Sequence, residues 1–153
     1  MNVRAAIAYA ALITLVVVGL YAYATLPASI PTSFGFDGRP AAWGPKLTVL
    51  LLPAIGVFAF VLISVVQTVK PRANLPFYVS DDRVDAVQAV VYAGTADLKT
   101  VLMCGLLALT VASIANSGGT LSPVFLPVVI AVVGAVILVV AYILVRAWRA
   151  ASA

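Results

Sequence analysis

Long apolar runs without charges alternate with short polar segments along the whole chain. The apolar runs predict membrane-spanning helices at about residues 5–26, 47–69, 97–115 and 124–145. At a rise of about 1.5 Å per residue, about 20 residues cross a hydrocarbon core of about 30 Å. We therefore predict an all-α integral membrane protein, with four transmembrane helices in two hairpins and a single domain over residues 1–153.

The first run also has features of a secretory signal. Arg4 precedes its apolar core, and Ala22-Tyr23-Ala24 has the small-x-small form of a cleavage site. We interpret the run as an uncleaved helix, because it is longer than a usual signal core and because Tyr21 and Tyr23 resemble an interfacial aromatic belt. In the second run, Pro53 predicts a slight kink.

The connector 70–96 changes character at residue 84. Its segment 80–83 has the composition of a helix start, in which Ser80 or Asp82 caps exposed N–H groups. From Val84 onward, apolar residues recur at helical spacing with polar residues between them. This pattern predicts an amphipathic extension before the third helix, which lies on the inner membrane surface, packs against the bundle or continues the third helix.

The basic residues beside the spans predict the orientation. One side of the membrane holds six of them and the other side two, namely Arg4, Lys70, Arg72, Arg83, Arg146 and Arg149 against Arg39 and Lys46. Because cytoplasmic loops carry the excess of Lys and Arg, both termini are predicted to be cytoplasmic. Loop 27–46 is then extracytoplasmic, and the extension that begins at Val84 is cytoplasmic.

Composition narrows the class of protein further. Hydrophobic residues make up 64% of the chain and charged residues 9%, whereas soluble domains have roughly 25% charged residues. We therefore predict a multi-pass protein of the bacterial plasma membrane. Its predicted partner is the lipid bilayer. The net charge of +4 does not indicate nucleic-acid binding, because the basic residues form no stripe or cluster.

The residue types offer little for catalysis or metal binding. Histidine is absent, glutamate is absent, and Cys104 is the single cysteine. The usual ligand sets for zinc or iron cannot be assembled, and no nucleophile-and-base set can be proposed. We therefore predict no metal, no cofactor and no enzymatic activity.

Two charges lie near the start of the third helix. Asp97 and Lys99 could gate a cytoplasmic vestibule or act as interfacial anchors. Two residues apart, they point to different faces of a helix, which favours the anchors. Small residues at four-residue spacing in the third and fourth helices permit close helix approach and leave homo-oligomerisation open.

Loop 27–46 is the most distinctive segment. Prolines and glycines stiffen it, and Asp37-Gly38 predicts a tight turn. One interpretation is a binding surface for an extracytoplasmic ligand, with the contacts Phe34, Phe36, Arg39, Trp43 and Lys46. The other, favoured by residue physics alone, is that the aromatic residues seat the loop at the lipid headgroups.

A spaced set of residues in and after this loop carries a family resemblance. The set comprises Leu26-Pro27, Ile30-Pro31-Thr32, Gly38, Trp43-Gly44, Lys46 and Pro53, with a weaker continuation through Asn74-Leu75-Pro76 and the helix start near Asp82. It resembles the bacterial membrane family called domain of unknown function 1648, which also forms the N-terminal part of SdpI-type immunity proteins. Ser33 stands where that family commonly has histidine.

The resemblance implies a membrane-resident immunity or sensing function against a secreted toxin. We therefore predict a plasma-membrane immunity or sensor protein whose loop recognises an extracytoplasmic peptide or lipid-like toxin. The alternative is a small transporter or channel unit, or an accessory subunit of a membrane complex. Its partner would be a second copy of the chain or another membrane protein.

Overall fold

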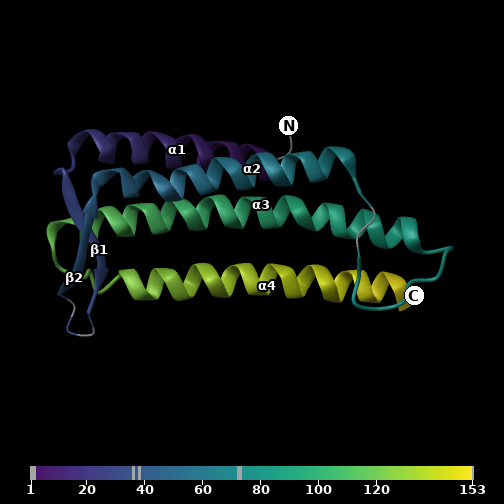
Figure 1. Cartoon of the computed structure of the whole chain (residues 1–153). Coiled ribbons are helices and arrows are strands. Elements are labelled where there is room, and N and C mark those ends of the chain that lie inside the picture. The colour runs from purple at the N-terminus through teal and green to yellow at the C-terminus, as the bar shows by residue number, and fades with distance from the viewer. Residues whose placement is uncertain (1–2, 36, 38, 72–73, 153) are drawn as a thin grey trace.

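The computed structural model describes residues 3–35, 37, 39–71 and 74–152. Within these ranges the chain is mostly helical, and its long helices run side by side (Figure 1), namely α1 (Val3–Thr25), α2 (Leu51–Val69), α3 (Val84–Ala115) and α4 (Phe125–Ser152). In this described part, four helices are long and apolar enough to cross a membrane. The prediction of four candidate spans is confirmed.

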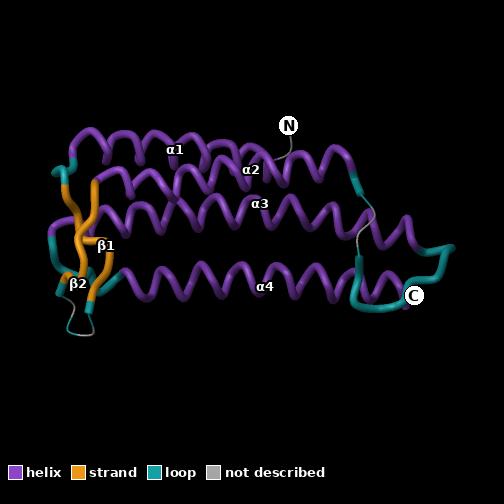
Figure 2. The backbone as a smooth tube through the Cα atoms, viewed as in Figure 1, coloured by secondary structure: helices purple, strands orange, loops and turns teal. Residues whose placement is uncertain are grey.

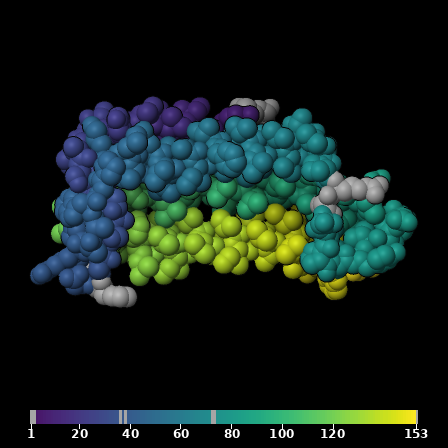
Figure 3. All heavy atoms as spheres, in the orientation of Figure 1, coloured from purple at the N-terminus to yellow at the C-terminus, as the bar shows by residue number. Residues whose placement is uncertain are grey.

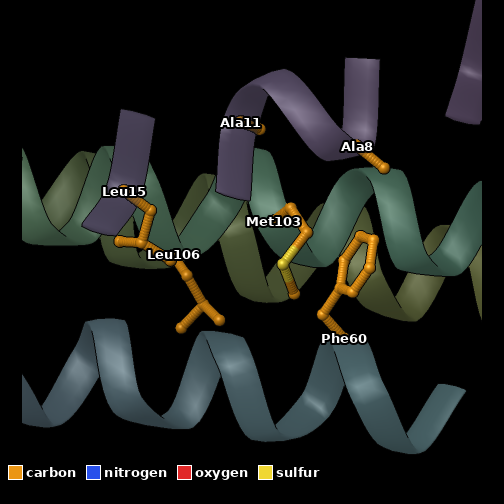
Figure 4. Packing of buried hydrophobic residues seen from close by; sticks show 6 residues of the cluster. All are labelled: Ala8, Ala11, Leu15, Phe60, Met103 and Leu106. Carbon is orange, nitrogen blue, oxygen red and sulfur yellow. The ribbon is translucent and has the colours of Figure 1, made fainter. Parts of the chain in front are cut away.

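The buried core joins the first three long helices. Its side chains come from α1, α2 and α3 and pack around Met103, which is fully buried (Figure 4), with Ala8, Ala11, Leu15, Phe60 and Leu106. On the other side of α3, a close approach to α4 depends on glycine. A Cβ atom at Gly94 would meet the side chain of Ile143, and one at Gly105 would meet that of Val132. α3 thus packs against both α1 and α4.

α3 is one continuous helix from Val84, so the predicted amphipathic extension continues the third helix. α4 is also longer than predicted, and Arg83 Nη1, directly before α3, donates a hydrogen bond to the carbonyl of Ala151 in its last turn at 3.1 Å. The capping prediction is wrong. Arg83 is the cap residue and makes no side-chain cap bond, while a hydrogen bond from the Ser80 side chain holds the pKa of Asp82 below its ordinary value.

α2 follows a short 3-10 helix, η1 (Lys46–Leu50). Pro53 therefore lies in the first turn of the α-helix, not in its interior. Backbone N–H groups in a first turn have no partner within the helix, so the missing N–H of proline costs no hydrogen bond there. The predicted kink is not required by this position.

The predicted loop 27–46 contains a β-hairpin, which an all-α prediction omits. β1 (Ser29–Phe34) pairs antiparallel with β2 (Pro40–Pro45), with irregularities in register after Pro31 and after Ser33. A two-stranded sheet has two free edges, which is where prolines are tolerated in strands. The hairpin lies across one end of the bundle (Figure 2), which we call the hairpin end. The connector between α2 and α3 and the C-terminus of α4 lie towards the other, which we call the connector end (Figure 1).

Candidate functional site

The base of the β-hairpin is fixed to the helices. Ile30 of β1 is buried in a small apolar cluster with Ala22 of α1 and Val49 of η1. The backbone N–H of Lys46 donates to the carbonyl of Ala28 at 3.0 Å, which closes the hairpin where it meets η1. The two strands therefore stand on a packed base and protrude at the end of the molecule (Figure 3).

Lys46 belongs to this base and not to the tip. Its Nζ atom lies 4.7 Å from the ring centroid of Tyr23, near the end of α1. A cation over an aromatic face is attracted by the ring quadrupole. Lys46, one of the predicted ligand contacts, thus fastens the hairpin to α1.

Trp43 and Phe34, two further predicted contacts, lie farther out along the hairpin than Lys46. Trp43 is 59% exposed and faces Pro31 across the sheet. Phe34 is half-buried opposite Pro40, at the end of the paired region. Phe36 lies outside the described residues.

Arg39 is held by the turn that precedes β2. Its backbone N–H donates to Asp37 Oδ1 at 3.1 Å, and its carbonyl accepts a hydrogen bond from Gly35 N at 2.8 Å. The Arg39 side chain is 85% exposed, with Nε 3.9 Å from Asp37 Oδ2. Its guanidinium is therefore presented to the surroundings from an ordered backbone.

A cavity of about 410 Å³ lies beside the hairpin base, against α2 and α3. Its lining is largely apolar, and hydroxyl groups enter it from Thr32, Thr48, Thr110 and Ser113. Thr110 is fully buried and donates to the carbonyl of Leu106 at 2.8 Å. The described residues among the predicted contacts do not line this cavity, whereas Pro31 and Thr32 of β1 do.

A second polar site lies within the bundle, and the sequence interpretation missed it. Lys99 of α3 is only 7% exposed, and its Nζ atom donates to Gln67 Oε1 at 2.8 Å and to Ser64 Oγ at 3.3 Å. The same Nζ lies 4.7 Å from the ring centroid of Phe60. Lys99 is therefore not an interfacial anchor: its side chain reaches from α3 to α2 and is held there by side chains of α2.

The hydrogen bonds continue from Lys99 along α3. Gln67 Nε2 donates to Thr95 Oγ1 at 3.1 Å, and Thr95 Oγ1 donates to the carbonyl of Tyr92 at 2.8 Å. Among the residues that the structure describes, no carboxylate forms an ion pair with Lys99. The cluster thus accepts two hydrogen bonds from the lysine and places its amine near the Phe60 ring, without neutralising its charge.

Asp97 has a different partner on the other side of α3. Its Oδ1 atom lies 2.9 Å from Arg4 Nη1, and Thr100 Oγ1 donates to the carbonyl of Arg4 at 3.2 Å. Residues two apart on a helix point to different faces, which is why Asp97 reaches α1 while Lys99 reaches α2. The contact of Lys99 with α2 had a signal in the sequence. Ser64 and Gln67 are three residues apart and so share one face of the second run.

In the described ranges, no group of three or more Asp, Glu, Cys or His side chains could hold a metal ion. Fold and sites together define a chain with four helices able to cross a membrane and a fixed β-hairpin at one end, which is consistent with a multi-pass membrane protein.

Comparison with known families adds one finding. Residues 10–57 match the family described as Domain of unknown function (DUF1648), which confirms the resemblance over these residues. The match covers most of α1, the β-hairpin and the beginning of α2, and leaves α3 and α4 outside it. Searches of curated proteins and of solved structures found no match.

Proposed function

We propose that this chain is an immunity or sensor protein of the bacterial plasma membrane, and that its β-hairpin recognises an extracytoplasmic peptide or lipid-like toxin. One observation carries the proposal. The hairpin is fixed at its base by Ile30 and Lys46, while Trp43 and Arg39 are exposed beyond that base. The link to SdpI-type immunity proteins is part of this proposal.

The chemistry of the exposed residues supports recognition. Trp and Arg are enriched among the residues that dominate binding energy at interfaces. A hairpin that is already ordered loses less conformational entropy on binding than a slack loop, and its prolines reduce that loss further. A two-stranded sheet also has free edges, to which an extended peptide can add as a strand.

The proposal includes a topology. Both termini face the cytoplasm, the helices pair as α1 with α2 and α3 with α4, and the first turns of α3 extend beyond the membrane on the cytoplasmic side. The basic residues support this orientation, since Arg39 and Lys46 are alone on the hairpin side. The hairpin then faces the outside, where a secreted toxin arrives.

A double alanine variant tests the function. Arg39→Ala with Trp43→Ala removes both exposed contacts and leaves the packed base intact, so we expect lost protection at an unchanged amount of protein in the membrane. Protection is measured as survival of a deletion strain that carries the variant and is exposed to medium conditioned by neighbouring cells. Trp148→Ala with Arg149→Ala, a matched pair at the connector end, should protect fully. Full protection by the hairpin variant would refute the proposal.

One observation favours a second candidate function, that of a transport unit or an accessory subunit of a membrane complex. Ionisable residues inside membrane bundles are rare and are commonly functional, and Lys99 is such a residue. For this candidate, deletion of the gene should reduce a solute flux or destabilise a partner complex. The immunity proposal expects sensitivity to a secreted toxin without either effect.

A further inference from the structure

A cleft of about 660 Å³ opens at the connector end of the molecule, between the end of α2 and the first turns of α3. We call it the α2–α3 cleft. Its polar lining consists of Gln67, Lys70, Asp85, Gln88 and Tyr92. Its volume is in the range of pockets that bind small molecules or headgroups, about 300 to 1,000 Å³. It is separate from the hairpin and does not depend on the function proposed for it.

The cleft carries one base and one acid that do not neutralise each other. Lys70 and Asp85 both line it and both are exposed. In the described part of the chain, neither forms an ion pair with the other or with a third residue. The lining therefore offers a cationic and an anionic group at the same time, which suits a ligand that carries both charges.

A buried hydroxyl in the same lining lacks a partner. The Oη atom of Tyr92 is shielded from solvent and makes no hydrogen bond to the described residues. Buried polar groups are almost always hydrogen-bonded, and an unpaired one is a sign of a missing ligand, ion or water. Because Tyr92 Oη is shielded from solvent, it does not face the open cleft.

The inner wall of the cleft is electropositive. Gln67 lies there with its carboxamide fixed between Lys99 at 2.8 Å and Thr95 at 3.1 Å. One N–H of its amide group remains available, because each carboxamide nitrogen has two. The charge of Lys99, without a carboxylate partner in the described residues, lies directly behind this wall. An anionic group is favoured on this side of the cleft.

We propose that the α2–α3 cleft binds the headgroup of phosphatidylethanolamine, a zwitterionic phospholipid. The phosphate lies towards Lys70 and Gln67, and the primary ammonium donates hydrogen bonds to Asp85. The cleft lies at the level expected for lipid headgroups, because Lys70 directly follows the apolar run that ends at Val69. A choline headgroup fits less well, because quaternary ammonium groups are bound by cages of several aromatic residues and Tyr92 is the single aromatic residue in this lining.

Lipid binding to the purified full chain in detergent tests the proposal. Native mass spectrometry should show phosphatidylethanolamine retained in preference to both phosphatidylcholine and phosphatidylglycerol. Asp85→Asn should reduce the preference over phosphatidylcholine roughly tenfold, because a charge-assisted hydrogen bond contributes about 1.5 to 3 kcal/mol. Asp85→Glu should retain the preference. Asp81→Asn, an exposed acid outside the lining, should leave it unchanged.

Other variants test the contacts proposed for the lipid phosphate. Lys70→Gln should weaken retention of all phosphate-bearing lipids, and Arg149→Gln, an exposed base of α4, should not. Equal retention of the three lipids, or a preference for phosphatidylglycerol that survives Asp85→Asn, would overturn the proposal. Glycerophosphoethanolamine that binds as tightly as the lipid would assign the cleft to a soluble ligand and would also overturn it.

Discussion

Lys99 introduces a positive charge into a helix bundle whose other buried contacts are largely apolar. Its amine donates to Gln67 and Ser64 and lies near the ring of Phe60, so two of its three N–H donors have partners within the bundle. Such a cation is stable only while these partners are present, because a buried charge that loses its hydrogen bonds bears the full cost of desolvation. The effect of a substitution on the stability of the bundle should therefore depend on which residue of the cluster is replaced.

Replacing Gln67, the hydrogen-bond acceptor, should lower the stability of the bundle more than removing the charge of Lys99. Gln67→Leu deprives Lys99 of its 2.8 Å partner, and we expect it to lower the stability of the bundle by about 1 to 3 kcal/mol. Lys99→Met removes the charge and leaves only the neutral Gln67 Oε1 without its donor, so it should cost less stability than Gln67→Leu, and it should rescue Gln67→Leu in the double variant. Thermal unfolding of the purified variants in detergent measures all three. A double variant no more stable than Gln67→Leu would contradict this account of the cluster.

At the scale of elements, the apolar runs predicted where the four long helices lie, because length and hydropathy alone determine a membrane span. The ends of the helices were harder to predict. α4 continues to Ser152 because alanine, tryptophan and arginine tolerate a helix and because Ala147 is buried there, a packing contact that hydropathy does not register.

The β-hairpin could not be predicted from its pattern. Its strands are short and rich in proline, and their register is irregular, so the period-two signal of a half-buried strand is lost. Of the tight turn predicted at Asp37-Gly38, Asp37 Oδ1 accepts a hydrogen bond from the backbone N–H of Arg39, while Gly38 lies outside the described residues. The grouping of Lys99, Gln67 and Ser64 also escaped prediction, because it depends on how α2 faces α3.

The contact between α3 and α4 yields a prediction about close packing. Gly94→Ala places a methyl group against Ile143, so it should destabilise the bundle by about 1 to 3 kcal/mol through overpacking. Gly134→Ala, where a Cβ atom meets nothing within 4 Å, should be neutral or slightly stabilising because alanine favours the helix. Unfolding midpoints in detergent compare the two. Equal midpoints would show that the α3–α4 contact is looser than described.

At the scale of the whole molecule, the two ends differ in chemistry. The hairpin end presents Trp43 and Arg39 on a paired ribbon, and the connector end holds the α2–α3 cleft, whose Lys70 and Asp85 form no ion pair with the described residues. Among the described basic residues, Lys70 follows α2, Arg83 precedes α3, and Arg146 and Arg149 belong to the last turns of α4, all towards the connector end. This asymmetry is expected of a membrane protein with a fixed orientation.

The central claim, that the hairpin is an extracytoplasmic recognition surface, depends on which side of the membrane it faces. Single cysteines at Ala41, Arg83 and Ala151, in a chain with Cys104→Ser, can be labelled in intact cells by a maleimide that does not cross membranes. We expect label at position 41 only, with positions 83 and 151 labelled after the cells are opened. Label at 83 and 151 but not at 41 in intact cells would place the hairpin in the cytoplasm and contradict the account.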